Sequence, residues 1–253
     1  MAALAQPSAA YDAIVVGGGH NGLVAAAYLA KAGLRTLLLE RRPTLGGTVE
    51  TRTLDDGSRA PGLFHTVGRL RPAVFRELDL GSRGLSLVAP EVRAFAPQPD
   101  GRAVTLWASP DRTASGLAAW SAADAAAWAG FDRHVRALSG FLAALGEQVP
   151  PATSGPGFGD AITGLLLGRA YKKLSRADAR NLLRVLPMAV ADFVGEWFES
   201  DAVRATVAAR AVQLTALGAW SMGTTATLLA DSAGNDGGAA GQTVFARGGP
   251  GSL

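Results

Sequence analysis

Three glycines and one acid near the start of the chain have the types and the spacing of a dinucleotide site. Gly17, Gly19 and Gly22 give the pattern G-x-G-x-x-G, with Gly18 as an additional small residue. Without side chains, these positions allow a tight turn, a close approach of the backbone to a pyrophosphate, and close packing of the following helix. Glu40 lies 40 − 22 = 18 positions after the last of these glycines, near the spacing of about 20 at which a carboxylate binds ribose hydroxyls.

The residues around this pattern predict the elements that would position it. Residues 13–16 are a short apolar run that stops at the first glycine, as a buried parallel strand does. The Ala-rich segment 21–32 predicts a helix whose free N–H groups and positive dipole end would face the phosphates. A second strand over 36–39 would end at the acid. Because these features agree, the sequence favours a dinucleotide site over a glycine turn with a structural role alone.

The acid at position 40 also bears on the type of dinucleotide. Its carboxylate would accept hydrogen bonds from ribose hydroxyls and would repel a 2′-phosphate, which disfavours NADP. Arg41 and Arg42 follow it directly and keep an NADP site open as a weaker alternative.

The segment from residue 40 to residue 80 resembles the flavin-binding opening of the FAD-dependent phytoene desaturase and amine oxidase superfamily, in its phytoene dehydrogenase-like branch. In that superfamily the ribose acid is followed by basic residues and by a Gly-Gly pair that approaches the flavin end of the cofactor. Glu40, Arg42, Gly46 and Gly47 match this arrangement. The resemblance implies that the cofactor is FAD. The residues expected to contact it are Gly17, Gly18, Gly19, Asn21, Gly22, Glu40, Arg41, Arg42, Gly46, Gly47 and Thr48.

The expected fold is therefore α/β, with a Rossmann-like FAD-binding βαβ domain and an inserted region of mixed β-strands and helices for the substrate. We expect a disordered lead over 1–10, the FAD-binding segment over 11–73, the substrate region over 74–230, and a return towards the FAD domain over 231–253. The last residues, 245–253, resemble a Gly-Gly-x-Gly turn at which members of the superfamily begin another helix. The expected fold is accordingly a truncated one that covers the first half of the superfamily pattern.

Several elements of the inserted region can be predicted from local pattern. Turn residues at 99–102 join two short strands into a hairpin. From Ser121, apolar residues recur at steps of three and four and predict a long helix with one apolar face, and Ser200 is expected to cap a later helix. In the resembling fold, part of this apolar surface meets the C-terminal half. We therefore expect side chains such as Trp128, Phe131 and Leu138 to stay partly exposed in a fragment.

Two further features have a functional and a structural interpretation. His65 lies where the superfamily brings the chain close to the flavin, but a His packed under a turn is the favoured interpretation. In the segment from Asp160, apolar residues are followed by Arg169, Lys172 and Lys173. These groups would suit a peripheral contact with a membrane surface, although an ordinary helix with solvated basic side chains is favoured.

Composition excludes several classes of function. The chain has no Cys, so disulphides, thiolate catalysis and Cys-ligated metals are excluded, and its three scattered His residues do not predict a metal site. The formal charge of +3 is mild and the Arg residues are scattered, so we expect no nucleic-acid partner. Residues 1–10 lack the basic and apolar regions of a secretory signal, and we expect a cytoplasmic protein.

The leading function is an FAD-dependent oxidoreductase that moves a hydride from a C–H bond of a small-molecule substrate to the flavin, as the resemblance implies. An inactive flavin-binding fragment, or one half of a split protein with a C-terminal-half partner or a second copy of itself, is the alternative from another class. An NAD-dependent dehydrogenase is the third hypothesis. Since a flavin supplies the reactive chemistry itself, no catalytic side chain can be named from the sequence.

Overall fold

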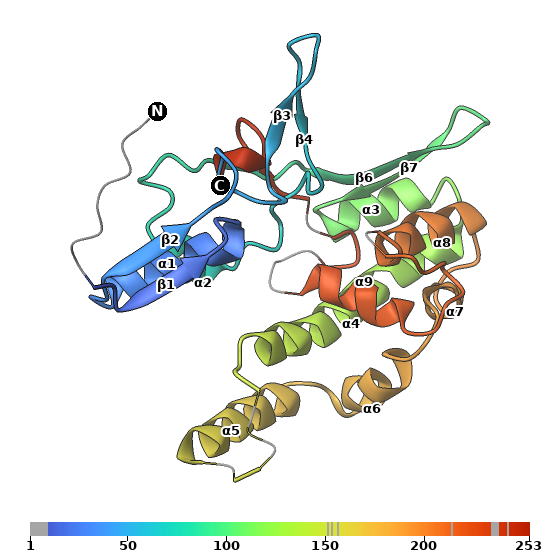
Figure 1. Cartoon of the computed structure of the whole chain (residues 1–253). Coiled ribbons are helices and arrows are strands. Elements are labelled where there is room, and N and C mark those ends of the chain that lie inside the picture. Colours follow the sequence, from blue (N-terminus) through green and yellow to red (C-terminus); the bar gives the residue numbers. More distant parts are fainter. Residues whose placement is uncertain are drawn as a thin grey trace. The chain divides into compact units, whose positions relative to one another are not determined.

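The computed structural model describes residues 10–150, 152, 154–155, 157–213, 215–233, 238–241 and 243–253. The chain divides into unit 1, Met1–Val88 with Val244–Leu253, and unit 2, Ala89–Thr243 (Figure 1). The expected disordered lead lies outside the described residues except for Ala10. A βαβ unit, hairpins and helices together confirm the predicted α/β class.

The βαβ element of unit 1 is formed as the sequence predicts. Strands β1 (Ala13–Val16) and β2 (Thr36–Leu39) pair in parallel, and α1 (His20–Lys31) connects them. The backbone N–H of Gly17 donates to the Leu39 carbonyl at 2.7 Å, so the hydrogen bonding of the two strands extends into the glycine loop. This arrangement places the glycine loop and the acid after β2 at the same edge of the sheet, where the carboxyl ends of parallel strands meet.

The remainder of unit 1 consists of short elements. A hairpin joins β3 (Thr51–Thr53) to β4 (Arg59–Pro61), α2 (Pro72–Glu77) follows, and β5 (Leu87–Val88) pairs antiparallel with β8 (Phe245–Ala246). The end of the chain then forms a 3-10 turn, η2 (Pro250–Ser252), in which Gly251 N–H donates to Thr51 Oγ1 at 2.9 Å. A small apolar cluster of Val67, Leu85, Val244 and Ala246 holds the two parts of the unit together. Residues 244–253 thus pack in unit 1, and so do residues 74–88, which include most of α2 and all of β5 and which the sequence assigned to the substrate region.

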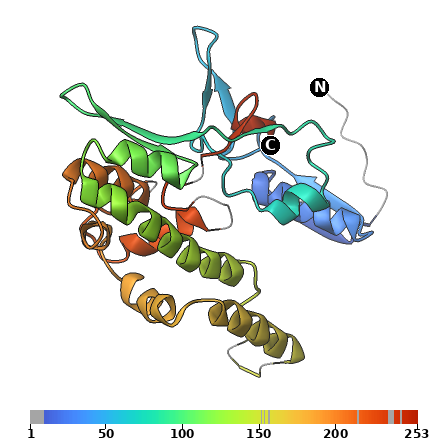
Figure 2. The same ribbon diagram turned by 180° about the vertical axis from the view of Figure 1, so that it is seen from behind.

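Unit 2 combines one β-hairpin with a group of helices. Strands β6 (Val92–Pro97) and β7 (Ala103–Trp107) form the expected hairpin. The helices and turns that come after it are α3 (Pro110–Leu117), α4 (Ala122–Gly146), α5 (Phe158–Lys172), α6 (Arg176–Val185), α7 (Val190–Gly195), α8 (Asp201–Ala208), η1 (Ala209–Ala211) and α9 (Thr224–Ser232). In two opposite views, α5 lies beyond the C-terminal end of α4, away from α7, α8 and α9 (Figures 1 and 2).

The apolar face of α4 forms the centre of the unit 2 core. Trp128, Phe131 and Leu138 are 0% exposed, so the expectation that these side chains stay partly exposed is wrong. The Phe131 ring lies 5.6 Å from Phe193 of α7 and 4.9 Å from Phe198, both measured between ring centroids. The helices of the same unit therefore cover this face, because they bring their own aromatic side chains to it.

The start of α8 involves a contact with α4. Ser200 is the N-cap residue of α8, as predicted, but its side chain makes no capping hydrogen bond. The buried carboxylate of Asp124 accepts hydrogen bonds from the backbone N–H groups of Glu199 at 2.8 Å and Ser200 at 3.1 Å. Ser121 caps α4 as predicted, since its Oγ accepts from Asp124 N–H at 3.1 Å. An acid in the first turn of α4 thus positions the turn before α8.

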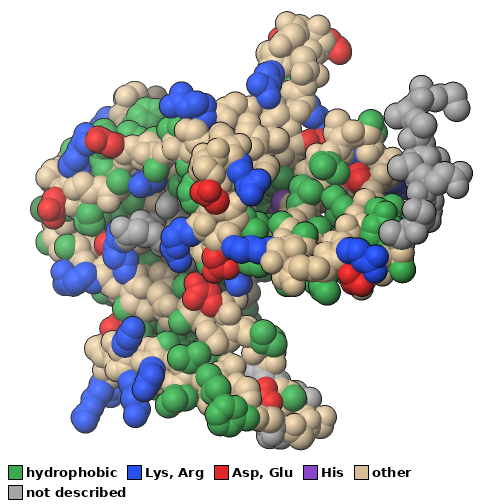
Figure 3. Space-filling model, turned by 90° about the vertical axis from the view of Figure 1, so that its left-hand side faces the viewer, with side chains coloured by type: hydrophobic (Ala, Val, Ile, Leu, Met, Phe, Trp, Pro, Cys, Tyr) green, Lys and Arg blue, Asp and Glu red, His purple; other side chains and the backbone are tan. Residues whose placement is uncertain are grey.

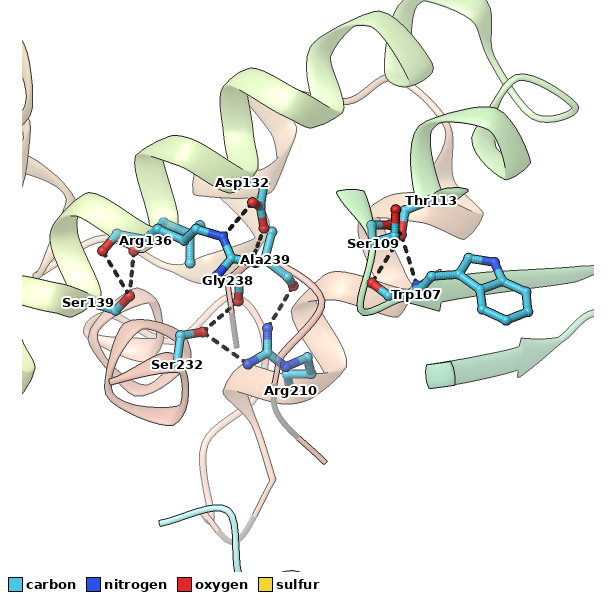
Figure 4. A network of polar contacts seen from close by, with 11 residues as sticks. Trp107, Ser109, Thr113, Asp132, Arg136, Ser139, Arg210, Ser232, Gly238 and Ala239 are labelled. Atoms are coloured by element: carbon cyan, nitrogen blue, oxygen red, sulfur yellow. Dashed lines mark hydrogen bonds and ion pairs between the residues drawn. The ribbon is translucent and has the colours of Figure 1, made fainter. Parts of the chain in front are cut away.

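A polar network ties the segment 238–241 to the helices of unit 2 (Figure 4). The Asp132 carboxylate accepts from Arg136 Nε at 2.7 Å and from the backbone N–H of Ala239 at 2.8 Å. Arg210 Nη1 donates to the Ala239 carbonyl at 2.7 Å, and its Nη2 donates to Ser232 Oγ at 3.0 Å. These buried charged groups are paired and hydrogen-bonded, as burial requires.

Candidate dinucleotide-binding site

The glycine loop between β1 and α1 needs glycine at two positions for different reasons. Gly17 has φ +107°, a conformation that residues with side chains rarely adopt. A Cβ at Gly22 would lie 2.0 Å from the backbone oxygen of Gly17. Helix α1 therefore packs against the loop at a distance that no larger residue at position 22 permits.

The N-terminus of α1 is open to a bound anion. Gly19 is the N-cap residue in an extended conformation, and it has no side chain to accept a hydrogen bond from the first turn. The first turn contains no acid. His20 and Asn21, the first two residues of the helix, are exposed. Free N–H groups and the positive end of the helix dipole suit a phosphate group at this point.

Glu40 follows β2 and its carboxylate turns towards the glycine loop. Its Oε2 accepts from the backbone N–H of Gly18 at 2.7 Å, and its Oε1 accepts from the backbone N–H of Arg42 at 2.9 Å. The N–H groups of Arg42 and Gly18 hold the pKa of Glu40 below its ordinary value, so the side chain is an anion at neutral pH. Each oxygen keeps a second acceptor position for an outside donor such as a hydroxyl.

The second glycine pair lies directly against the loop. Gly46 N–H donates to the Gly18 carbonyl at 2.8 Å, and Gly19 and Gly46 form an isolated parallel bridge. A Cβ at Gly47 would lie 3.0 Å from the Cα of Gly19. Two segments nearly thirty positions apart thus meet at these glycines through backbone atoms, beside Glu40 and the N-terminus of α1.

The partly exposed side chain of Arg42 holds the second glycine pair in place. Its Nη2 donates to the Gly47 carbonyl at 2.9 Å, and its Nη1 lies 3.0 Å from Glu50 Oε2. Glu50 also accepts from Arg52 Nε at 2.6 Å, and these two arginines, Arg52 first, hold the pKa of Glu50 below its ordinary value. Glu50 has a structural role that the sequence did not predict, because no spacing rule links it to Arg42 eight positions earlier.

The other predicted contact residues lie nearby on the surface. Arg41 and Thr48 are exposed, as is Asn21. The structure brings the four loop glycines, Glu40, Arg42 and the pair Gly46 and Gly47 together. Their contact with a cofactor stays a prediction.

The three histidines lie in different parts of the chain, and His20 begins α1 at this site, where it is exposed. His65 is exposed in unit 1. His134 belongs to unit 2, where its Nδ1 lies 2.7 Å from Asp178 Oδ1. Burial raises the pKa of Asp178, but hydrogen bonds from Ser175 and His134 outweigh this effect and the pKa lies below its ordinary value. The His134 and Asp178 pair links α4 to α6, and no local pattern in the sequence indicated it.

Comparison with known families supports the interpretation of this region. Residues 15–95 match the family described as NAD(P)-binding Rossmann-like domain. This region is a Rossmann-like dinucleotide-binding domain. The match includes the end of β1, all of α1 and β2, Glu40 and both glycine segments.

Similar proteins of known sequence are longer than this chain. The chain is 28% identical over 215 residues to pyridine nucleotide-disulfide oxidoreductase domain-containing protein 2 of Rattus norvegicus, a match that covers 80% of the chain and 37% of that protein. It is 32% identical over 152 residues to one of the subunits of limonene dehydrogenase of Castellaniella defragrans, covering 59% of the chain and 26% of that protein. The matches thus span little more than a third of these relatives at most.

Solved structures share the fold over nearly the whole of this chain. A variant of putrescine oxidase superposes with a TM-score of 0.51 at 19% identity, covering 94% of this chain and 46% of that one. Rab GDI from Plasmodium falciparum superposes with a TM-score of 0.52 at 12% identity, covering 96% and 54%. At such identities the likeness concerns the fold alone.

Proposed function

We propose that the Rossmann-like domain binds FAD and that the chain belongs to an FAD-dependent oxidoreductase. The observation that carries this proposal is the contact of Gly19 with Gly46 and Gly47 beside Glu40. A dinucleotide needs bare backbone and a helix N-terminus at its pyrophosphate, and a carboxylate at its ribose. The second glycine pair extends this bare surface beyond the loop, which favours a longer flavin cofactor over NAD.

The residues of the site would divide the binding between them. The N–H groups at the start of α1 would bind the pyrophosphate, and Glu40 would accept hydrogen bonds from ribose hydroxyls. Arg42 would act indirectly, since its hydrogen bond to the Gly47 carbonyl fixes the second glycine pair. FAD, when bound, supplies the chemistry by accepting a hydride from a C–H bond of the substrate. The chain binds and orients the cofactor.

The substrate class that we propose is an apolar molecule or an amine. This rests on the resemblance to the phytoene desaturase and amine oxidase superfamily, and on a relative that is a subunit of limonene dehydrogenase. The hydride would leave a carbon atom, and no acid or base of this chain is assigned to the step.

A catalytically inactive flavin-binding fragment, or one half of a protein that needs a partner chain, is the second candidate. Two observations favour it. The match covers 37% of the rat relative, and the two-stranded sheet has an exposed apolar face, with Ile14 at 58%, Val16 at 84% and Leu39 at 47% exposure. Parallel sheets are normally covered on both faces. The partner would be a chain with the C-terminal half, or a second copy of this one.

A visible absorption spectrum of the purified protein tests the cofactor. Absorption bands of an oxidised flavin that remain with the protein through gel filtration are expected, whereas bound nicotinamide without these bands would contradict the FAD proposal. Anaerobic loss of the flavin bands on adding an amine or a terpene would then support the oxidoreductase. Flavin that is retained but never reduced, unless a chain with the C-terminal half is added, would favour the second candidate.

A further inference from the structure

Helix α5 has an inner face and an outer face that differ in their contacts. Thr163, Leu167 and Ala170 are half-buried on the inner face. Near its C-terminal end, the Tyr171 ring meets Phe141 of α4 edge-on, with 5.8 Å between ring centroids. These contacts attach α5 to unit 2 and fix which side of the helix turns outward.

The outer face of α5 is apolar although it is exposed. Phe158, Ile162, Leu165 and Leu166 recur at helical spacing, and Phe158 and Leu165 are 83% and 57% exposed. A helix with apolar residues on both faces is normally buried on both. Figure 3 shows hydrophobic side chains gathered on the arm of the molecule that contains α5. The outer face therefore lacks a cover within the described part of the chain.

Basic residues continue the same face at its C-terminal end. Arg169, Lys172 and Lys173 follow Leu165 at steps of three and four, which places them on one side of the helix with the apolar residues. Arg176 and Arg180 follow on α6. Within the described residues, none of these five side chains forms an ion pair with an acid.

The two acids of this segment do not compensate this charge, because both are engaged elsewhere. The Asp160 carboxylate accepts from the backbone N–H groups of Gly157 at 2.6 Å and Ala152 at 3.0 Å. Asp178 is paired with His134. The outer face thus joins an apolar stripe to an excess of positive charge.

We propose that the outer face of α5 binds the surface of a lipid bilayer that contains anionic lipids. An apolar stripe enters the boundary between headgroups and acyl chains, and basic residues at its end bind anionic headgroups. Such a helix lies in the interface plane, and no helix among the described residues is long and apolar enough to cross a bilayer. This surface lies outside the dinucleotide site, so the proposal does not depend on the bound cofactor.

Vesicle co-sedimentation of the full chain tests the charge contribution. We expect binding to vesicles of equal parts phosphatidylcholine and phosphatidylglycerol, much weaker binding to phosphatidylcholine alone, and weaker binding at high salt. Lys172→Gln with Lys173→Gln should weaken the binding by about 25-fold, since each basic residue near an anionic surface contributes about fivefold. Arg59→Gln with Arg76→Gln removes the same charge from exposed positions of unit 1 and should leave the binding unchanged.

A second pair of variants tests the apolar contribution. Phe158→Ser should weaken binding to the anionic vesicles, whereas Phe95→Ser, at a position 65% exposed on β6, should not. Equal binding by all variants would overturn the proposal. Absence of binding to the anionic vesicles would also overturn it. If the Phe158→Ser chain then elutes at a smaller size than the wild type in gel filtration, the face is a contact between polypeptides. Both positions are exposed, so far-ultraviolet circular dichroism should stay unchanged.

Discussion

Gly22→Ala is the sharpest test of the glycine loop. The new Cβ would lie 2.0 Å from the Gly17 oxygen, whereas real contacts of this kind do not fall below 3.0 Å. The gap of 3.0 − 2.0 = 1.0 Å must be opened by moving the backbone, because the opposing atom is a backbone oxygen with no rotamer to change. The N-terminus of α1 would then shift away from the loop and from the position that suits the pyrophosphate.

The expected size of the effect follows from two opposing contributions. Overpacking costs about 1–3 kcal/mol, and replacing glycine by alanine inside a helix returns up to about 1 kcal/mol. Because the clash is with backbone, the upper part of the overpacking range applies, about 2–3 kcal/mol. The net loss of about 1–2 kcal/mol in the stability of the loop corresponds to roughly a 5-fold to 30-fold weaker FAD affinity. Gly140→Ala is the matched control, since Gly140 is exposed in the middle of α4 with no atom within 4 Å of an added Cβ. It should stabilise unit 2 by about 0.5–1 kcal/mol.

Two independent signals separate loss of the site from general unfolding. FAD affinity is measured by quenching of flavin fluorescence. All five tryptophans of the chain lie in residues 107–220 and therefore report on unit 2 alone. Gly22→Ala should weaken FAD binding and leave the thermal transition of tryptophan emission in place, whereas Gly140→Ala should raise that transition and leave FAD binding unchanged. Wild-type FAD affinity in the Gly22→Ala protein would refute the close packing of helix on loop.

Other substitutions test the acid, the ion pair and the core. Glu40→Ala should weaken FAD binding by about 10-fold to 150-fold in calorimetric titration, because a charged acceptor is lost, and Glu40→Gln should lose less because it keeps one acceptor oxygen. Since the folded pKa of Asp178 is below its unfolded value of 3.8, its contribution to stability is present above that pH and is lost as the pH falls through the folded pKa. Asp178→Asn should flatten the fall of the free energy of unfolding at acid pH, followed by tryptophan emission. An unaltered pH dependence would contradict the role assigned to Asp178. Phe131→Ala should lower the free energy of unfolding in urea by about 3–5 kcal/mol, whereas the exposed Phe158→Ala should change it by less than about 0.5 kcal/mol.

Local pattern in the sequence determined the elements that carry the site. The glycine spacing, the apolar strands on either side of an Ala-rich helix, and the acid after the second strand predicted β1, α1 and β2 within one residue. The same reasoning placed the start of α4 at the Ser121 cap. These predictions hold because turn conformation, helix capping and hydrophobic period depend on residues only a few positions apart.

Only the tertiary structure decided what each surface meets. The period of α4 predicted which side chains form its apolar face, but not that Phe193 and Phe198 cover Phe131. Nor could it show that the outer face of α5 lacks such a cover within the described part of the chain.

The same limit applies to the candidate site. Contact of Gly47 with Gly19, and the bond from Arg42 that holds the Gly47 carbonyl, depend on how two segments meet in space. Pairing of β5 with β8 joins residues more than 150 positions apart. A single sequence contains the preferences of each segment, whereas the choice of partner is made by the packing of all segments together, which no local pattern records.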